Sequence, residues 1–187
     1  MFKQKDQKGR KLQDVYVAVV QSGDLKSLQN LLDDKRKINA PIGRFGLTPL
    51  HLCAIFGQVE IAIWLLENKA KIDKKESASG KTPLHLAARF GHVDLLDIIL
   101  EQSKELPNSK RFLEDTAKCR PIHYGCMQED QRVVELLLKH GDQPNAFASI
   151  GTPLDIAIYK KNLPLADFLS LDHVYILLVF SSIQNGN

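Results

Sequence analysis

Residues 80–100, GKTPLHLAARFGHVDLLDIIL, decide the fold of this chain. Thr82 can cap a helix with its hydroxyl, and Pro83 suits the first helical position, where its missing N–H costs nothing. Gly91 permits a left-handed turn after this short helix, and a strongly apolar second helix follows. The stretch therefore predicts a helix–turn–helix unit whose apolar flanks need neighbouring units to bury them.

Three further stretches of the chain repeat this sequence pattern. Residues 46–66 read GLTPLHLCAIFGQVEIAIWLL, and looser copies occupy residues 119–138 and 151–169. The spacings between equivalent positions are 34, 38 and 32 residues, measured at Thr48, Thr82, Arg120 and Thr152.

A TPLH-containing unit with a period of about 33 residues is the pattern of ankyrin repeats. The chain resembles the ankyrin-repeat family in these four copies and in a degenerate first copy over residues 14–38. The resemblance implies an all-α fold, an α-solenoid of stacked helix–turn–helix units with hairpin-like finger loops. We expect five repeats within residues 14–172, at about 14–45, 46–79, 80–118, 119–150 and 151–172.

Charge separates the N-terminus from the repeats. Residues 1–11 hold five basic residues and one Asp, while the whole chain has a net charge of +3, so the remainder is close to neutral. We predict a basic, disordered arm over residues 1–13. Because the repeats then lack a face that neutralises many phosphates, we expect no nucleic-acid partner.

An apolar tail, residues 173–187, follows the last repeat. Its residues 174–180 read VYILLVF, which is too short to span a bilayer. One interpretation is an irregular cap that packs against the last helix pair. The alternatives are a disordered tail, an alternative terminus and an aggregation-prone segment.

The first residues are polar and lack the apolar core of a secretory signal. The three cysteines, Cys53, Cys119 and Cys126, are too few and too irregular for a disulfide scaffold. We therefore expect a cytoplasmic protein, with the nucleus as the alternative location. We also expect a monomer without a transmembrane segment.

No nucleotide-binding glycine motif, G-x-S-x-G or HExxH motif occurs in the chain, so we expect neither an enzyme nor a cofactor. His51, His85 and His123 recur at one repeat position without a recurring nucleophile, which favours packing over catalysis. The family resemblance implies that each ring bonds the threonine of its own TPLH and the backbone of the adjacent repeat. His123 faces Arg120 instead of threonine and so lacks its usual partner.

Cys119, His123 and Cys126 lie four and three residues apart, so on a continuous helix they could bind zinc. However, Pro121 is expected to start the helix after Cys119, and no fourth ligand is evident. We therefore predict no metal site.

The resemblance implies that a partner protein binds to the finger tips and to the residues before each inter-helix glycine. Aromatic and arginine side chains gather there, as in protein–protein hot spots, and Ile55 and Ser79 lie among them. The predicted function is a non-enzymatic adaptor or scaffold, and the predicted site is Arg44, Phe45, Leu47, Phe56, Lys81, Arg89, Phe90, Met127 and Tyr159. We expect Arg44, Phe45, Phe56, Arg89 and Phe90 to form its centre. Phe56 and Phe90 share one repeat position, and the alternative is that these two are half-buried between helices.

Two other functions stay open. Asn145 follows a sequence that resembles the helix end and finger of the family, where asparagines are hydroxylated in some ankyrin repeats. The alternative is that Asn145 simply forms hydrogen bonds with the backbone of its finger. The chain could also be the ankyrin part of a larger enzyme or channel. The long link Glu101–Lys118 is either functional or merely tolerated.

The C-terminal copies lack glycine at the inter-helix turn. Glu129 and Lys161 stand there, and a non-glycine residue in a left-handed turn costs about 1 kcal/mol. We predict that these copies are the less stable half.

Overall fold

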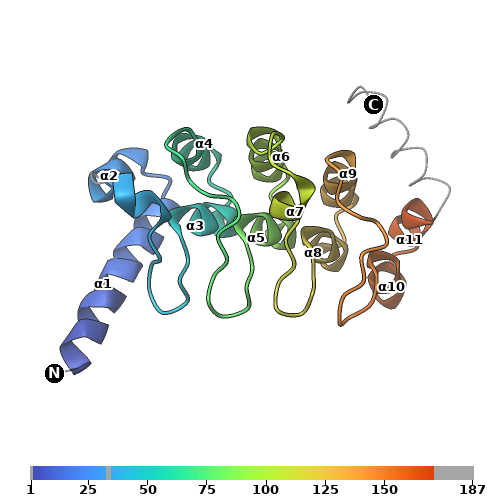
Figure 1. Cartoon of the computed structure of the whole chain (residues 1–187), viewed down its shortest axis with the longest axis horizontal. Helices are drawn as coiled ribbons and strands as arrows, with labels where there is room; N and C mark the ends of the chain where they lie inside the picture. The colour runs from blue at the N-terminus through green and yellow to red at the C-terminus, as the bar shows by residue number, and fades with distance from the viewer. Residues whose placement is uncertain (1, 33–34, 171–187) are drawn as a thin grey trace.

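The computed structural model describes residues 2–32 and 35–170, with side chains at 12–32 and 37–170. Helices in this part of the chain pair in succession, and the pairs stack in a row (Figure 1). The pairs are α1 (Phe2–Gln21) with α2 (Leu25–Leu31), α3 (Pro49–Phe56) with α4 (Val59–Glu67), α5 (Pro83–Phe90) with α6 (Val93–Gln102), α8 (Pro121–Gln128) with α9 (Gln131–Lys139), and α10 (Pro153–Tyr159) with α11 (Leu163–Leu169). The all-α solenoid is confirmed.

Two short elements lie outside these pairs, the 3-10 helix η1 (Lys35–Asn39) and helix α7 (Asn108–Arg111). None of the helices in the described ranges is long and apolar enough to cross a membrane. The apolar tail, 173–187, lies outside the described residues.

The N-terminal arm differs from our expectation. Helix α1 begins at Phe2, so the backbone is helical where we expected a disordered arm over residues 1–13. Its C-terminal half supplies the first repeat's core through Tyr16 and Val20, which pack with Leu28 of α2. The arm therefore continues a repeat helix, and no break in the backbone marks a boundary at residue 13.

The first helix of each central repeat begins and ends as its residues dictate. Thr48 and Thr82 are extended N-caps followed by proline, and Gly57 and Gly91 end the helices with φ of 72° and 71°. Left-handed turns persist in the two last repeats without glycine, at Glu129 (φ 65°) and Lys161 (φ 58°).

Two buried histidines link successive repeats. The backbone N–H of Thr48 donates to Nδ1 of His51 over 3.0 Å, and Nε2 lies 3.1 Å from the Lys81 carbonyl oxygen. His85 makes the same contacts with Thr82 and the Cys119 carbonyl oxygen. Because Nδ1 accepts, the proton is on Nε2 and donates to the next repeat. Burial lowers the pKa of both rings to about 4.

The fourth repeat keeps most of this arrangement. The backbone N–H of Arg120 donates to Nδ1 of His123, and Nε2 reaches the Ala146 carbonyl oxygen, both over 3.0 Å. Our expectation that His123 lacks its partner is therefore wrong for the backbone and right only for the hydroxyl. The Arg120 side chain instead pairs with buried Asp142, Nε to Oδ1 2.7 Å.

Finger loops project beyond the first helices on one side of the row (Figure 1). Their chains are closed by isolated backbone contacts, such as the bridge between Ile42 and Leu47, and the described residues contain no strand. Each finger also bonds to the one before it through a backbone N–H and a hydroxyl of the same residue. These residues are Ser77, Thr116 and Ser149, whose N–H groups donate over 2.8–3.0 Å to the carbonyl oxygens of Phe45, Ser79 and Ala117.

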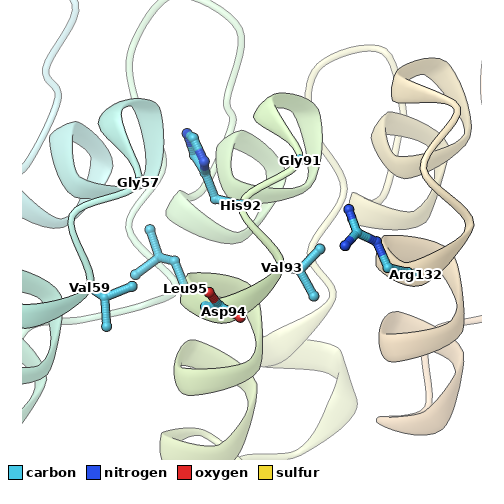
Figure 2. Close-up of a pocket in the computed structure, with 8 residues that line it drawn as sticks. All are labelled: Gly57, Val59, Gly91, His92, Val93, Asp94, Leu95 and Arg132. Carbon is cyan, nitrogen blue, oxygen red and sulfur yellow. The ribbon is translucent and has the colours of Figure 1, made fainter.

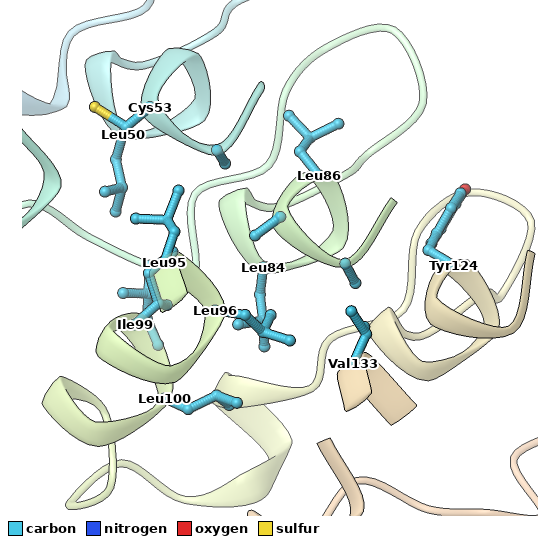
Figure 3. Packing of buried hydrophobic residues seen from close by; sticks show 14 of the residues in the cluster. Leu50, Cys53, Leu84, Leu86, Leu95, Leu96, Ile99, Leu100, Tyr124 and Val133 are labelled. Atoms are coloured by element: carbon cyan, nitrogen blue, oxygen red, sulfur yellow. The ribbon is translucent and has the colours of Figure 1, made fainter. Parts of the chain in front are cut away.

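Leucine and isoleucine side chains from consecutive repeats fill the space between the helix pairs (Figure 3). Leu84 and Leu95, for example, have at most 1% of their surface exposed. Burial of such a side chain contributes about 1.5–3 kcal/mol. The core is therefore continuous along the row.

The long link, Glu101–Lys118, packs against the neighbouring repeats. Phe112 is buried, and the Arg111 guanidinium lies 3.4 Å from the Leu100 carbonyl oxygen at the end of α6. These contacts give the link a packing role.

Candidate partner-binding groove

An open groove of about 500 Å³ lies between two successive fingers and the helices α3 and α5. Five residues of the predicted site line it together: Phe45, Leu47, Lys81, Arg89 and Phe90. Its other lining residues are Ile55, Glu76, Ser79 and Leu86. We call these nine residues the 45–90 groove.

The apolar part of the 45–90 groove comes from three elements. Phe45 of the first finger and Phe90 of α5 are 39% and 44% exposed, although their rings are large and apolar. Half-buried Ile55 of α3 and buried Leu86 of α5 complete this surface. Exposed aromatic rings beside aliphatic side chains are typical of hot spots in protein interfaces.

Cations surround this apolar surface. The Arg44 guanidinium lies 4.5 Å from the Phe45 ring centroid, so Arg44 flanks the groove. Lys81 Nζ and the Arg89 guanidinium lie 5.5 and 6.0 Å from the Tyr124 ring centroid. Such cation–π contacts position the charges without neutralising them.

The carboxylate in the groove, Glu76, is used within its own finger. It accepts hydrogen bonds from the backbone N–H groups of Ala78, Ser79 and Lys81 over 2.6, 2.8 and 3.1 Å. Burial alone would raise the pKa of Glu76, but the hydrogen bonds outweigh it and lower the pKa. Glu76 is therefore ionised and internally bonded, whereas the side chains of Arg44 and Arg89 are exposed and Lys81 is partly exposed.

Four predicted site residues do not line the groove, namely Arg44, which flanks it, and Phe56, Met127 and Tyr159. Phe56 and Met127 are partly buried and pack against the core, while Tyr159 is 85% exposed on α10. Phe56 therefore does not line the groove with Phe90, and its partial burial corresponds to the half-buried alternative. The Phe56 ring packs against the core, while the Phe90 ring stacks on His92 with centroids 6.3 Å apart.

Sequence reasoning missed Leu86 and Glu76. Leu86 lies four residues before Phe90, one helical turn away, and this spacing could have identified it. The bonding of Glu76 depends on how the finger closes, so no sequence signal indicated it.

A second cavity of about 250 Å³ lies beside the inter-helix turns (Figure 2). Its histidine, His92, follows Gly91, and Nε2 lies 3.1 Å from the Ile55 carbonyl oxygen of the preceding repeat. Arg132, also in the lining, pairs with Asp130 at 2.8 Å. Its polar groups serve contacts within and between repeats.

One cluster of the described residues has potential metal ligands, namely Asp97, Glu101 and His140. His140 Nε2 lies 3.6 Å from Glu101 and 3.8 Å from Asp97, while Nδ1 lies 3.3 Å from Arg111 Nη2. A guanidinium only donates, so Nδ1 accepts and Nε2 carries the proton. The neutral ring then has no lone pair left for a metal.

The other candidate ligands, Cys119, His123 and Cys126, are also poorly suited to zinc. Both ring nitrogens of His123 are hydrogen-bonded to the backbone. Burial raises the pKa of the Cys119 thiol to about 11 and that of Cys126 to about 12, far from the thiolate that zinc requires.

The modification candidate, Asn145, is exposed on the fourth finger. Exposure is needed for any modifying enzyme to reach it, and its hydroxylation stays a prediction.

Comparison with protein families matches residues 16–111 to ankyrin repeats (3 copies), just over half of the chain. No curated protein matches the chain. The matched region contains the end of α1 with α2, the second and third helix pairs, and the whole 45–90 groove. Ankyrin repeats are in general protein–protein interaction modules. By its repeats, its stacked helix pairs and this match, the chain belongs to the ankyrin-repeat family.

Proposed function

We propose that this protein is a non-enzymatic adaptor or scaffold that binds a partner protein in the 45–90 groove. The observation that carries the proposal is the exposure of two aromatic rings, Phe45 and Phe90, in one groove formed by two repeats. A monomeric solenoid has no internal use for such rings, whereas a partner could bury both.

The charges around the groove favour a partner segment with carboxylates beside apolar side chains. Arg44 and Arg89 are exposed and Lys81 is partly exposed, with Nζ donating to the Ser79 hydroxyl, while the carboxylate of Glu76 is internally bonded. An acidic, apolar segment would therefore match the groove in both charge and hydrophobicity.

The lining supports a binding role over a catalytic one. Its ionisable side chains are Glu76, Lys81 and Arg89, so no nucleophile lies beside a histidine base. A cytoplasmic or nuclear location belongs to the proposal, and it is supported by three free, buried cysteines.

Selection of random twelve-residue peptides displayed on phage would test this function. We expect the selected peptides to be rich in Asp or Glu and in apolar residues. Their affinity should fall about tenfold or more in Phe45→Ala and Phe90→Ala proteins, because hot-spot rings contribute 2 kcal/mol or more.

Tyr159→Ala is the matched control, since this exposed aromatic residue lies outside the groove. Its affinity for the selected peptides should equal that of the unchanged protein. Basic peptides, or peptides that bind the Phe45→Ala and Phe90→Ala proteins undiminished, would contradict the proposed site.

A further inference from the structure

The last repeat exposes apolar positions that the other repeats bury. One such position lies three residues before the inter-helix turn residue. It is 0% exposed in the first four repeats, where it is Val20, Ala54, Ala88 and Cys126. In the fifth repeat it is Ile158, which is 58% exposed. A second position is Leu28, Ala62, Leu96 and Val134, again each 0% exposed, and its fifth member, Ala166, is partly exposed.

A third position behaves in the same way. Leu50, Leu84 and Ile122 are at most 1% exposed, whereas Leu154 is only half-buried. The three positions therefore form the face that each repeat presents to the repeat after it. We call Leu154, Ile158 and Ala166 the open face.

The first repeat provides an internal check on this assignment. In the described structure, a helix pair packs on the side of the second repeat and no helix pair lies on the opposite side, and Val20 and Leu28 are completely buried. The position that faces backward shows the opposite trend. Ser27 is partly exposed in the first repeat, while its equivalent in the last, Leu165, is 0% exposed.

An ordinary sixth repeat does not suit the open face. In the inner repeats, the histidine Nε2 donates to a carbonyl of the next finger. Asp155 stands at that position in the last repeat, and its carboxylate accepts from the N–H and hydroxyl of Thr152, both over 2.8 Å. An ionised carboxylate cannot donate to a following carbonyl. The cover that fits is apolar and lacks a standard finger.

The sequence directly after the fifth repeat contains an apolar segment. Seventeen residues follow Ser170, and residues 174–180, VYILLVF, are all apolar or aromatic. The three intervening residues can span about 10 Å when extended, and they start at the end of α11, the helix that carries Ala166 of the open face. We propose that residues 174–180 cover the open face and so close the C-terminal end of the solenoid.

Thiol labelling of the full chain tests this proposal. Ile158→Cys introduces a thiol in the open face, and Leu163→Cys introduces one at a site on the same repeat that is 73% exposed and outside the face. We expect the thiol at position 158 to react about tenfold or more slowly with a thiol reagent. The native cysteines, Cys53, Cys119 and Cys126, are buried, so the unchanged protein gives the background rate.

A second substitution identifies the cover. In the Ile158→Cys protein, Leu177→Asp with Leu178→Asp should raise the labelling rate to that of Leu163→Cys. Equal rates for the two single variants, or slow labelling that survives the aspartates, would overturn the proposal. Slow labelling that appears only as the protein dimerises in light scattering would show that a second copy is the cover, and would also overturn it.

Discussion

The second and third repeats differ from the fifth at the histidine position, at the inter-helix turn and in the burial of the forward face. Their histidines bond to the next finger, their inter-helix turns have glycine, and their forward faces are buried. The fifth repeat has Asp155, Lys161 and exposed Ile158 at those places. Because the stability of a solenoid is the sum of repeat and interface terms, the comparison locates its weak end.

The largest expected difference in stability concerns the histidine position of the repeat, which is His85 in the third repeat and Asp155 in the fifth. His85→Ala removes a buried ring with hydrogen bonds to two repeats, so the free energy of unfolding should fall by about 3 kcal/mol. Asp155→Ala removes an exposed cap and should cost about 1 kcal/mol. Urea denaturation measures both values. Equal losses would contradict the assignment of the inter-repeat bond to histidine.

Acid should weaken the central repeats through the same residues. His51 and His85 have a folded pKa of about 4 and an ordinary unfolded pKa of 6.5, so the unfolded chain binds more protons between these values. Stability is therefore complete above pH 6.5 and is lost as the pH falls towards 4. From pH 7 to pH 5 the loss should be about 2 kcal/mol per histidine.

Urea denaturation at the two pH values checks this slope, with His85→Gln as the comparison. The variant should lose less stability over this range than the unchanged protein. Stability that stays level or rises on acidification would show that the rings titrate normally.

Substitutions at the inter-helix turns should change the free energy of unfolding by a smaller amount. A change to glycine should raise it, and a change from glycine should lower it. Glu129→Gly and Lys161→Gly should each add about 1 kcal/mol to the free energy of unfolding, because φ is 65° and 58° there. Gly91→Ala should lose a similar amount. Gly57→Ala should lose more, since a Cβ atom there would lie 2.8 Å from His92 Nδ1.

Glu129→Ala separates the turn from the ion pair. Its left-handed strain persists, and only the exposed pair between Glu129 and Lys160, at 3.1 Å, is removed. A gain in stability from Glu129→Ala equal to that from Glu129→Gly would mean that backbone strain is not the cause.

Recurrence explains which parts of the structure could be predicted from the sequence. The helix pairs, the histidine bonds and the left-handed turns each occur several times, so a clear copy identifies the equivalent residues in the other copies. Most of the groove followed from the same registers, because residues such as Phe45, Lys81 and Phe90 stand at finger and helix-end positions.

Features that depend on a single tertiary contact could not be predicted. Arg120 replaces a threonine, and only the fold brings it to buried Asp142. Phe56 and Phe90 share a register, yet Phe56 is partly buried against the core and Phe90 lines the groove. The helical N-terminus has a basic, polar sequence, and its composition alone favoured disorder.

Hydrogen exchange resolved by helix tests most directly the claim that links between repeats set local stability. The amides of α5 and α6 should exchange about tenfold or more slowly than those of α10 and α11, because the central pair is bonded and buried on both sides. Equal protection of the two helix pairs, or greater protection of α10 and α11, would contradict the account.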